Sequence, residues 1–289
     1  MKNKHWARRL FALAVFLIVI GGAASLAVGY VLGLPARAKI GNPPNDLPIE
    51  NVSTKSESGN LLSGWFIPGK AGRGVVLLLH GVRGNRLAML ARARFLHNAG
   101  YASLLIDLSS HGESEGKQIS FGAYESLDVI AAVDYLTRKL PNEKIGIIGV
   151  SLGGASTLLA AQKIRVNAVV VESVYPTITN AITNRLTMRL GRLGAAFVPL
   201  LTTQLKLRLG VTPDDLRPID KISQIGAPIF VMSGTKDQHT KISESEALFA
   251  AAIEPKEFWS VTNAAHVDLH NFTAKEYEQK ILSFFQRNL

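Results

Sequence analysis

Residues 145–154 read Ile-Gly-Ile-Ile-Gly-Val-Ser-Leu-Gly-Gly, an apolar run that ends in a serine between glycines. Such a short apolar run is typical of a buried strand, and the pattern from 151 to 163 is helical. Gly149 and Gly153 stand two residues before and after Ser151, where a sharp strand-to-helix turn leaves no space for side chains. We therefore predict a reactive serine at this turn. An ordinary glycine-rich connection with a capping serine is the alternative.

The same alternation of strand and helix patterns continues along the chain. Strands are predicted at 61–67, 74–80, 101–107, 144–150, 167–172, 228–233 and 257–261. Helices are predicted at 86–99, 121–140, 151–163, 243–252 and 273–287. Continuous apolar strands such as 75–79 and 168–171 are expected to be buried on both faces, as in a parallel sheet. The sequence thus predicts one α/β domain over residues 49–289.

Residues 175–218 interrupt this alternation, because no strand pattern appears there. Arg185, Arg189 and Arg192 recur at helical spacing beside an apolar stripe of leucines at 186, 190 and 193. We interpret the segment as a helical cap inserted into the domain. Its basic face is expected to rest on a membrane surface, or alternatively to point into water while the leucines pack on the core.

The N-terminal region differs in kind from the rest of the chain. Residues 10–34 contain no charged side chain, and a helix of this length spans roughly 37 Å, enough to cross a bilayer. A basic flank, residues 1–9, precedes it, and a Pro-rich linker, residues 35–48, follows it. The distribution of basic residues predicts a cytoplasmic N-terminus and an extracytoplasmic domain. Secretion after cleavage of a signal peptide is the alternative.

Composition excludes several kinds of chemistry. The 289-residue chain has no cysteine, which rules out disulfides, a cysteine nucleophile and zinc held by cysteines. Its formal net charge is +10, and four of the positive charges precede the apolar segment. Basic runs with interleaved aromatic residues do not occur, so we predict no nucleic-acid partner and relate the charge to anionic membrane surfaces.

A serine hydroxyl needs a base to become a nucleophile, and two later residues could complete the set. Asp237 follows the strand predicted at 228–233, and His266 follows the strand predicted at 257–261. We expect His266 to accept the serine proton and Asp237 to orient the imidazole. Asp107 is an alternative acid, and His266 with His270 could instead form a metal pair.

Two backbone N–H groups are expected to stabilise the oxyanion that forms on the substrate. One belongs to Leu152, directly after the serine. The other is assigned to Val82, or to Arg83 beside it, in the glycine-rich loop that follows the strand predicted at 74–80.

Five ordered elements together resemble a known family. They are His80-Gly81-x-x-Gly84, Asp107 with Gly112-x-Ser114, Gly149-x-Ser151-x-Gly153, Gly234-x-x-Asp237 and Ala265-His266. The set resembles the serine hydrolases of the α/β-hydrolase superfamily, in the branch of monoacylglycerol-lipase-like and serine-aminopeptidase-like enzymes. The resemblance covers about residues 50–289. It implies a mostly parallel eight-stranded sheet flanked by helices, with a helical cap.

These observations predict a membrane-anchored serine hydrolase that cleaves a lipid-like or small acyl ester through an acyl-enzyme, without a metal or organic cofactor. The membrane, through the N-terminal helix, and the ester substrate are the expected partners. A serine peptidase or amidase is one alternative function. A catalytically silent hydrolase fold that acts as a scaffold or carrier is another.

Overall fold

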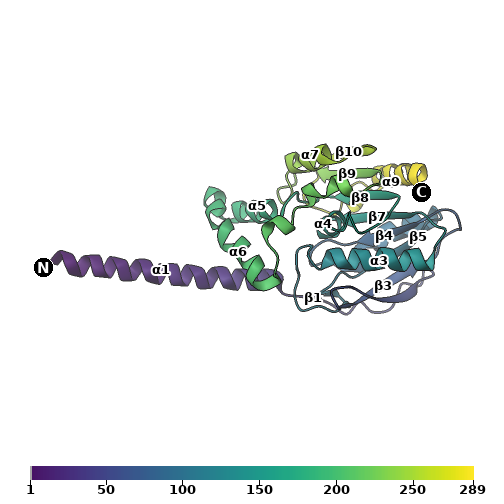
Figure 1. Ribbon diagram of the computed structural model, residues 1–289. Helices are drawn as coiled ribbons and strands as arrows, with labels where there is room; N and C mark the ends of the chain where they lie inside the picture. The colour runs from purple at the N-terminus through teal and green to yellow at the C-terminus, as the bar shows by residue number, and fades with distance from the viewer. Residues whose placement is uncertain (1) are drawn as a thin grey trace.

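The computed structural model describes residues 2–289, which fold around one central sheet (Figure 1). Within these residues eight strands pair in the order β10-β9-β8-β7-β4-β5-β3-β2. The strands are β2 (Glu50–Lys55), β3 (Leu61–Ile67), β4 (Val75–Leu79), β5 (Ala102–Ile106), β7 (Ile145–Val150), β8 (Ala168–Glu172), β9 (Ile229–Gly234) and β10 (Lys256–Val261). The mostly parallel eight-stranded sheet expected from the sequence is confirmed.

Pairing is parallel from β10 to β5 and antiparallel where β3 joins β5 and where β2 joins β3. The sequence did not predict β2. This edge strand is polar and buries only Val52, so its apolar period is too weak to identify it. Edge strands of this kind pair on one side only, and because most of their side chains contact solvent they are rich in polar residues.

Helices cover both faces of the sheet, as the continuous apolar strands require. The helices α3 (Glu125–Lys139) and α4 (Leu152–Leu159) pack on one face with alternate side chains of β4 such as Leu77. On the other face Leu78 packs with α2 (Leu90–Asn98), α8 (Leu269–Phe272) and α9 (Ala274–Asn288). The remaining helix of the core, α7 (Ile242–Ala251), precedes β10 and contributes Leu248.

The helices begin and end close to their predicted limits, with three clear differences. Helix α2 begins at Leu90 rather than at 86, because Arg86–Met89 form a 3₁₀ turn. Helix α3 begins at Glu125 rather than at 121, because the Glu125 carboxylate accepts the N–H groups of Ser120 and Gly122 and holds the preceding residues in a turn. Helix α4 ends at Leu159 rather than at 163, where the N–H of Lys163 donates to Ala160 in a tighter turn.

The segment between β8 and β9 is helical. It contains α5 (Ile178–Leu190), a 3₁₀ segment (Gly191–Phe197), α6 (Val198–Leu209) and short 3₁₀ turns at 213–215, 218–220 and 222–224. Figure 1 shows α5 and α6 as a pair that projects from the sheet toward the N-terminal helix. We call residues 175–218 the cap.

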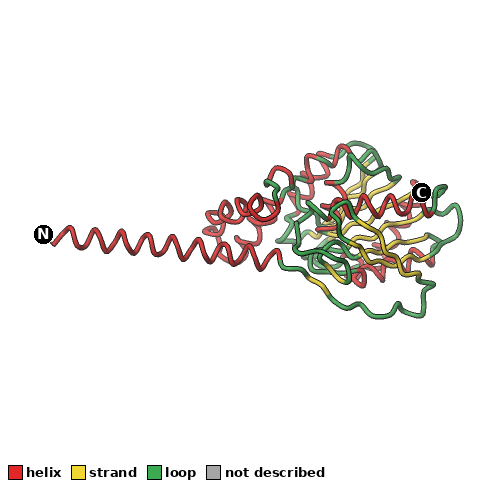
Figure 2. The backbone as a smooth tube through the Cα atoms, turned by 60° about the horizontal axis from the view of Figure 1, so that its bottom comes forward, coloured by secondary structure: helices red, strands yellow, loops and turns green. Residues whose placement is uncertain are grey.

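The N-terminal helix α1 (Lys2–Gly33) extends away from the domain, and α6 lies beside its C-terminal part (Figures 1 and 2). Among the described residues, one helical stretch, residues 8–33, is long and apolar enough to cross a membrane. Directly after it, β1 (Ala36–Arg37) pairs in parallel with β6 (His111–Gly112), which fixes the end of α1 against the domain.

Candidate active site

Ser151 occupies the turn between β7 and α4 in a conformation that is rare for a side-chain-bearing residue. Its φ is 48° and its ψ is −107°, a strain that costs about 1–3 kcal/mol and is typical of functional turns. A Cβ on Gly153 would lie 2.6 Å from the Leu79 carbonyl oxygen, and one on Gly149 would lie 2.6 Å from the Cα of Gly154. Gly154 is needed as well, since a Cβ there would lie 2.3 Å from a methyl of Val174.

Asp237 and His266 are bonded to one another. Nδ1 of His266 lies 2.7 Å from Oδ2 of Asp237, and the N–H groups of His239 and Thr240 each donate to Oδ1 at 2.8 Å. Burial acts to raise the pKa of Asp237, but the hydrogen bond and charge of His266 and these two N–H groups outweigh it and lower the pKa. Asp237 is therefore an ionised carboxylate at neutral pH, and Nε2 of His266 is the ring nitrogen left free of this bond.

Ser151 lies in a cavity of about 560 Å³ under the cap, a volume in the usual range for small-molecule sites. His239 lines the same cavity, and its ring centroid is 5.0 Å from that of His266. Within residues 2–289 Ser151 and His266 share no direct hydrogen bond. Bonds between a nucleophile and its base commonly shorten only when substrate binds.

The loop after β4 passes beside the serine. A Cβ built on Gly81 would lie 3.6 Å from Cβ of Ser151, and Val82 lines the cavity. Across the described residues, the N–H groups of Val82, Arg83 and Leu152 have no hydrogen-bond acceptor. These unpaired N–H groups lie near Ser151, and their assignment to an oxyanion, through Leu152 and either Val82 or Arg83, remains a prediction.

His80 holds this loop in place, a function that we did not predict from the sequence. Its Nε2 accepts the N–H of Leu108 at 3.1 Å, so Nδ1 carries the proton and donates to the Gly81 carbonyl at 2.8 Å. Burial, together with the charge of nearby His111, lowers the pKa of His80 to about 3. The imidazole is therefore neutral at physiological pH. The one sequence feature that could have indicated this structural function is the position of His80 at the start of the His80-Gly81-x-x-Gly84 motif.

A buried ion-pair network supports the loop that carries His266. The guanidinium of Arg92 bonds Glu172 at 2.8 Å and Asp268 at 3.0 Å, and Tyr277 donates to Glu172. Glu172 ends β8, and its backbone carbonyl accepts the N–H of Ser151 at 2.8 Å. The network joins the surroundings of the serine to the segment that follows His266.

The alternatives weighed from the sequence occupy other surroundings. Asp107 is fully buried and accepts Nη1 of Arg86 at 2.6 Å and the N–H of Glu113 at 2.9 Å, so it fixes a turn. Nε2 of His270 lies 2.8 Å from Glu278, while His266 bonds Asp237. In the described part of the chain, no three His, Asp or Glu side chains gather in a way that could hold a metal ion.

His239 has a position that sequence reasoning missed. His239 follows β9, whereas the base is expected after β10, where His266 lies. The ring of His239 nevertheless forms part of the cavity wall beside His266. Burial lowers the pKa of His239, and the neighbouring His266 ring and the guanidinium of Arg185 act in the same direction. The ring is therefore a neutral neighbour of the Asp237–His266 pair.

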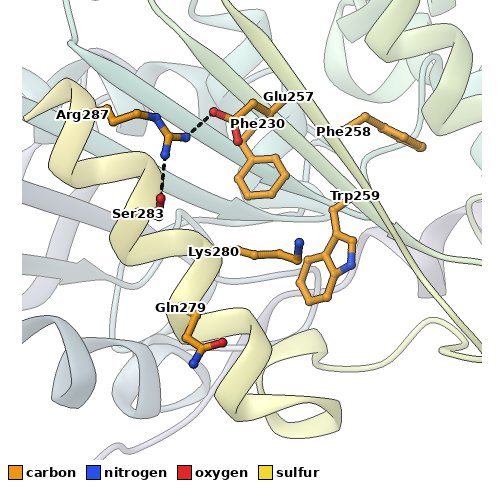
Figure 3. A pocket seen from close by; sticks show the side chains of 8 residues that line it. All are labelled: Phe230, Glu257, Phe258, Trp259, Gln279, Lys280, Ser283 and Arg287. Carbon is orange, nitrogen blue, oxygen red and sulfur yellow. Dashed lines mark hydrogen bonds and ion pairs between the residues drawn. The ribbon is translucent and has the colours of Figure 1, made fainter.

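A second hollow, of about 300 Å³, lies between β10 and α9 and shares no residue with the Ser151 cavity (Figure 3). Arg287 bridges it by bonding both Glu257 and Ser283, and the ammonium of Lys280 lies 5.1 Å from the ring centroid of Trp259. Within the described residues, the charged groups around this hollow already bind one another or an aromatic ring, so they offer no free partner to a ligand. We interpret the hollow as a surface depression between a strand and a helix.

The sheet order, with a serine on the turn after β7 and a helical insertion after β8, defines an α/β hydrolase. A family model described as serine aminopeptidase, S33, matches residues 70–221, more than half of the chain. The chain therefore belongs to this family. The matched range includes the His80–Gly84 loop, Ser151 and the cap, and it ends before Asp237 and His266.

Relatives of similar length support this assignment. An uncharacterized protein of Mycobacterium tuberculosis is 26% identical over 269 residues, which cover 90% of this chain and 89% of that protein. The protein YfhR of Salmonella typhi is 26% identical over 85% of this chain and 84% of its own. Among solved structures, an esterase of Pyrococcus furiosus, Pf2001, superposes with a TM-score of 0.74 at 25% identity, covering 89% of this chain and 98% of the esterase.

Proposed function

We propose that the protein is a membrane-anchored serine hydrolase that cleaves a carboxylic ester of a lipid-like or small acyl substrate. Ser151 is the nucleophile, His266 the base and Asp237 the residue that orients it. The observation that supports this most directly is the 2.7 Å bond between Asp237 and His266 at the sheet edge that also carries the strained Ser151. The similarity to a solved esterase favours an ester as the bond that is cleaved.

In the proposed first step, Oγ of Ser151 bonds to the carbonyl carbon of the ester while its proton passes to Nε2 of His266. The carbonyl electron pair moves onto the oxygen, which accepts N–H groups of Leu152 and Val82. Asp237 remains ionised and stabilises the imidazolium through Nδ1. The tetrahedral intermediate then breaks its bond to the alcohol, which leaves with the proton from His266.

In the second step, His266 takes a proton from water, and the resulting hydroxide attacks the acyl-enzyme. The bond between the acyl carbon and Oγ breaks, Ser151 regains a proton, and the carboxylic acid is released. Each proton moves between His266 and an oxygen at the reacting centre, so this chain's own side chains balance the reaction. A serine peptidase or amidase would use the same groups on a nitrogen leaving group.

The proposed location is the membrane, with α1 as a single span. The basic residues at the start of the chain favour a cytoplasmic N-terminus, and the hydrolase domain is then extracytoplasmic.

A fluorophosphonate probe tests the nucleophile on the full-length protein in detergent. We expect Ser151→Ala to abolish labelling and to lower kcat/KM for p-nitrophenyl butyrate by roughly 10⁴–10⁶-fold. Ser156→Ala is the matched control. Ser156 lies in α4, the helix that follows Ser151, is fully buried, and donates to the Leu152 carbonyl at 2.7 Å, so its loss should leave labelling intact.

The competing functions give different results in the same experiment. Labelling that persists in Ser151→Ala would assign the nucleophile elsewhere. A folded wild-type protein that takes no label would support the silent scaffold. Faster turnover of amino-acid amides than of butyrate and longer esters would support the peptidase.

A further inference from the structure

The last two turns of α1 form part of the wall of the cavity that contains Ser151. Val28, Gly29, Leu32 and Gly33 line it together with residues of α5 and α6, such as Leu205. A helix with the length and composition of a membrane span is thus in direct contact with the space above the serine. Without α1 this side of the cavity would be open.

Hydrogen bonds hold this end of α1 against the hydrolase domain. The N–H of Ile119 donates to the Gly33 carbonyl at 2.9 Å, and Nη2 of Arg83 donates to the Val31 carbonyl at 2.8 Å. These donors satisfy carbonyls that the C-terminal end of a helix leaves free. Because β1 pairs with β6 directly afterwards, α1 is fixed on both sides of its last turn.

A second set of contacts joins α1 to α6. Nε2 of Gln204 lies 3.1 Å from the Ser25 carbonyl and 3.0 Å from its hydroxyl, and that hydroxyl donates to the Leu200 carbonyl at 3.2 Å. The guanidinium of Arg208 lies 5.4 Å from the ring centroid of Tyr30. Polar groups within a bilayer need partners inside the protein, and here the two helices supply them for the Ser25 hydroxyl and the amide nitrogen of Gln204.

The cap exposes large apolar side chains next to α1. Leu207 is 82% exposed and Leu193 is 75% exposed, and Leu190, Phe197 and Leu200 are also exposed. These side chains belong to the end of α5, the 3₁₀ segment and α6. Exposed apolar side chains gathered beside a membrane-length helix are typical of a surface that inserts into the bilayer interface. Helix α6 lies beside the C-terminal part of α1 (Figures 1 and 2), and both helices carry exposed apolar side chains, such as Val28 on α1 and Leu207 on α6.

The rim of the cavity belongs to the same apolar surface. Val28, Leu32 and Met188 line the cavity and are also 46%, 42% and 45% exposed. A side chain that faces both the cavity and the outside lies at an opening, so the opening is bordered by residues of α1 and of the cap. An opening with apolar borders beside a membrane span admits an acyl chain without passing it through water.

We propose that α1 and α6 form an acyl-chain site that opens to the bilayer, so that the substrate is a lipid ester drawn from the membrane. One acyl chain lies against Leu32 and Leu205, with its carbonyl at Ser151. The activity test below rests on the proposed ester hydrolysis. A separate binding test does not.

Leu32→Trp fills the cavity from the α1 side, and Val31→Trp is the matched control. Val31 is the preceding residue, is 54% exposed, and does not line the cavity. With full-length protein in detergent, we expect Leu32→Trp to lower the ratio of kcat/KM for p-nitrophenyl palmitate over butyrate by about tenfold or more. Val31→Trp should leave the ratio within about twofold of wild type. An unchanged ratio in Leu32→Trp, or an equal fall in both variants, would overturn the proposal.

Binding can be measured without turnover in the Ser151→Ala background. The probe is a phosphatidylcholine with a diazirine at the end of one acyl chain, in vesicles that contain the full-length protein. We expect crosslinks within residues 28–33 and 201–209, reduced about tenfold by Leu32→Trp and unchanged by Val31→Trp. Crosslinks confined to the outer surface of α1 would overturn the proposal. If these crosslinks appear but the wild type cleaves no ester, the acyl-chain site stands and the proposed ester hydrolysis fails.

Discussion

The two sides of the Ser151 cavity are built in different ways. On the side of the sheet, Ser151, Asp237 and the loop after His80 are fixed by strand ends and buried hydrogen bonds. On the opposite side, α1 and the cap meet through a few polar contacts and leave apolar side chains exposed. Under the proposed function, the contrast separates chemistry, which needs precise geometry, from substrate choice, which depends on the shape and polarity of the wall.

The largest expected effect is at the sheet side. Asp237→Asn keeps the shape of the side chain but removes the charge that holds Nδ1 of His266 protonated. We expect kcat/KM for p-nitrophenyl butyrate to fall on the order of 10⁴-fold, with a thermal unfolding midpoint close to that of wild type. The same loss accompanied by a collapse of the unfolding midpoint would assign Asp237 a structural role instead.

The sheet side should also respond to acid through His80. Its pKa is lowered to about 3 in the folded protein, so the unfolded chain binds more protons between about pH 6.5 and 3. Folding stability should therefore fall as the pH drops through this range, by up to about 1.4 kcal/mol per pH unit. Denaturant unfolding of wild type and of His80→Gln, whose amide offers one acceptor and one donor without a titratable group, measures the contribution.

Asp128 changes the folding stability in the opposite direction. The quantity to compare is therefore the difference in stability between wild type and His80→Gln at each pH. Burial raises the pKa of Asp128 to about 7, so its protonation stabilises the fold as the pH falls from about 7 to 4. Both proteins contain Asp128, and subtraction removes its effect. Equal pH dependence in wild type and His80→Gln would show that His80 does not contribute.

The smallest expected effect is at the cap. Arg185 and Arg189 line the cavity whereas Arg192 does not, and in the part of the chain that the structure describes none of the three pairs with a carboxylate. Arg189→Glu should reduce turnover of esters in anionic vesicles by roughly 5- to 30-fold, since a basic residue near such a surface contributes about 1 kcal/mol and the substitution changes the charge by two units. Hydrolysis of soluble butyrate by each variant is the reference.

Arg192→Glu serves as the comparison because it makes the same charge change outside the cavity. A smaller loss in Arg192→Glu than in Arg189→Glu would locate the effect at the rim. Equal losses in both variants on anionic vesicles would indicate a general attraction of the cap to the membrane surface. Losses that persist on neutral vesicles would indicate a packing defect.

The two sides also differ in how far the sequence predicts them. The buried strands, the fold class and the turn at Ser151 follow from local patterns that survive in any context, namely apolar runs, glycine spacing and chain order. The reason for a glycine at position 154 became clear only from its close contact with Val174 in the structure. The edge strand β2 was missed because one buried side chain in six residues leaves no recognisable period.

The cavity wall that α1 forms with the cap could not be predicted from the sequence, for a physical reason. Ser25 and Gln204 are far apart along the chain, and the apolar pattern of α1 is the same whether the helix stands alone or lines a cavity. The contact between His239 and His266 could not be predicted for a similar reason, since it depends on how two loops approach one another. Composition identifies an apolar face but not the neighbour that covers it.

The contact between Arg83 and α1 means that a fragment prepared without the N-terminal helix would differ from the full-length protein near Ser151. Arg83 follows Val82 in the loop beside Ser151, and its side chain holds the carbonyl of Val31. A soluble fragment that begins near residue 40 would lack both that carbonyl and the α1 wall, so the loop would lose this contact and the cavity would be open to water. Substrate profiles recorded on such a fragment would describe a more permissive enzyme than the full-length chain.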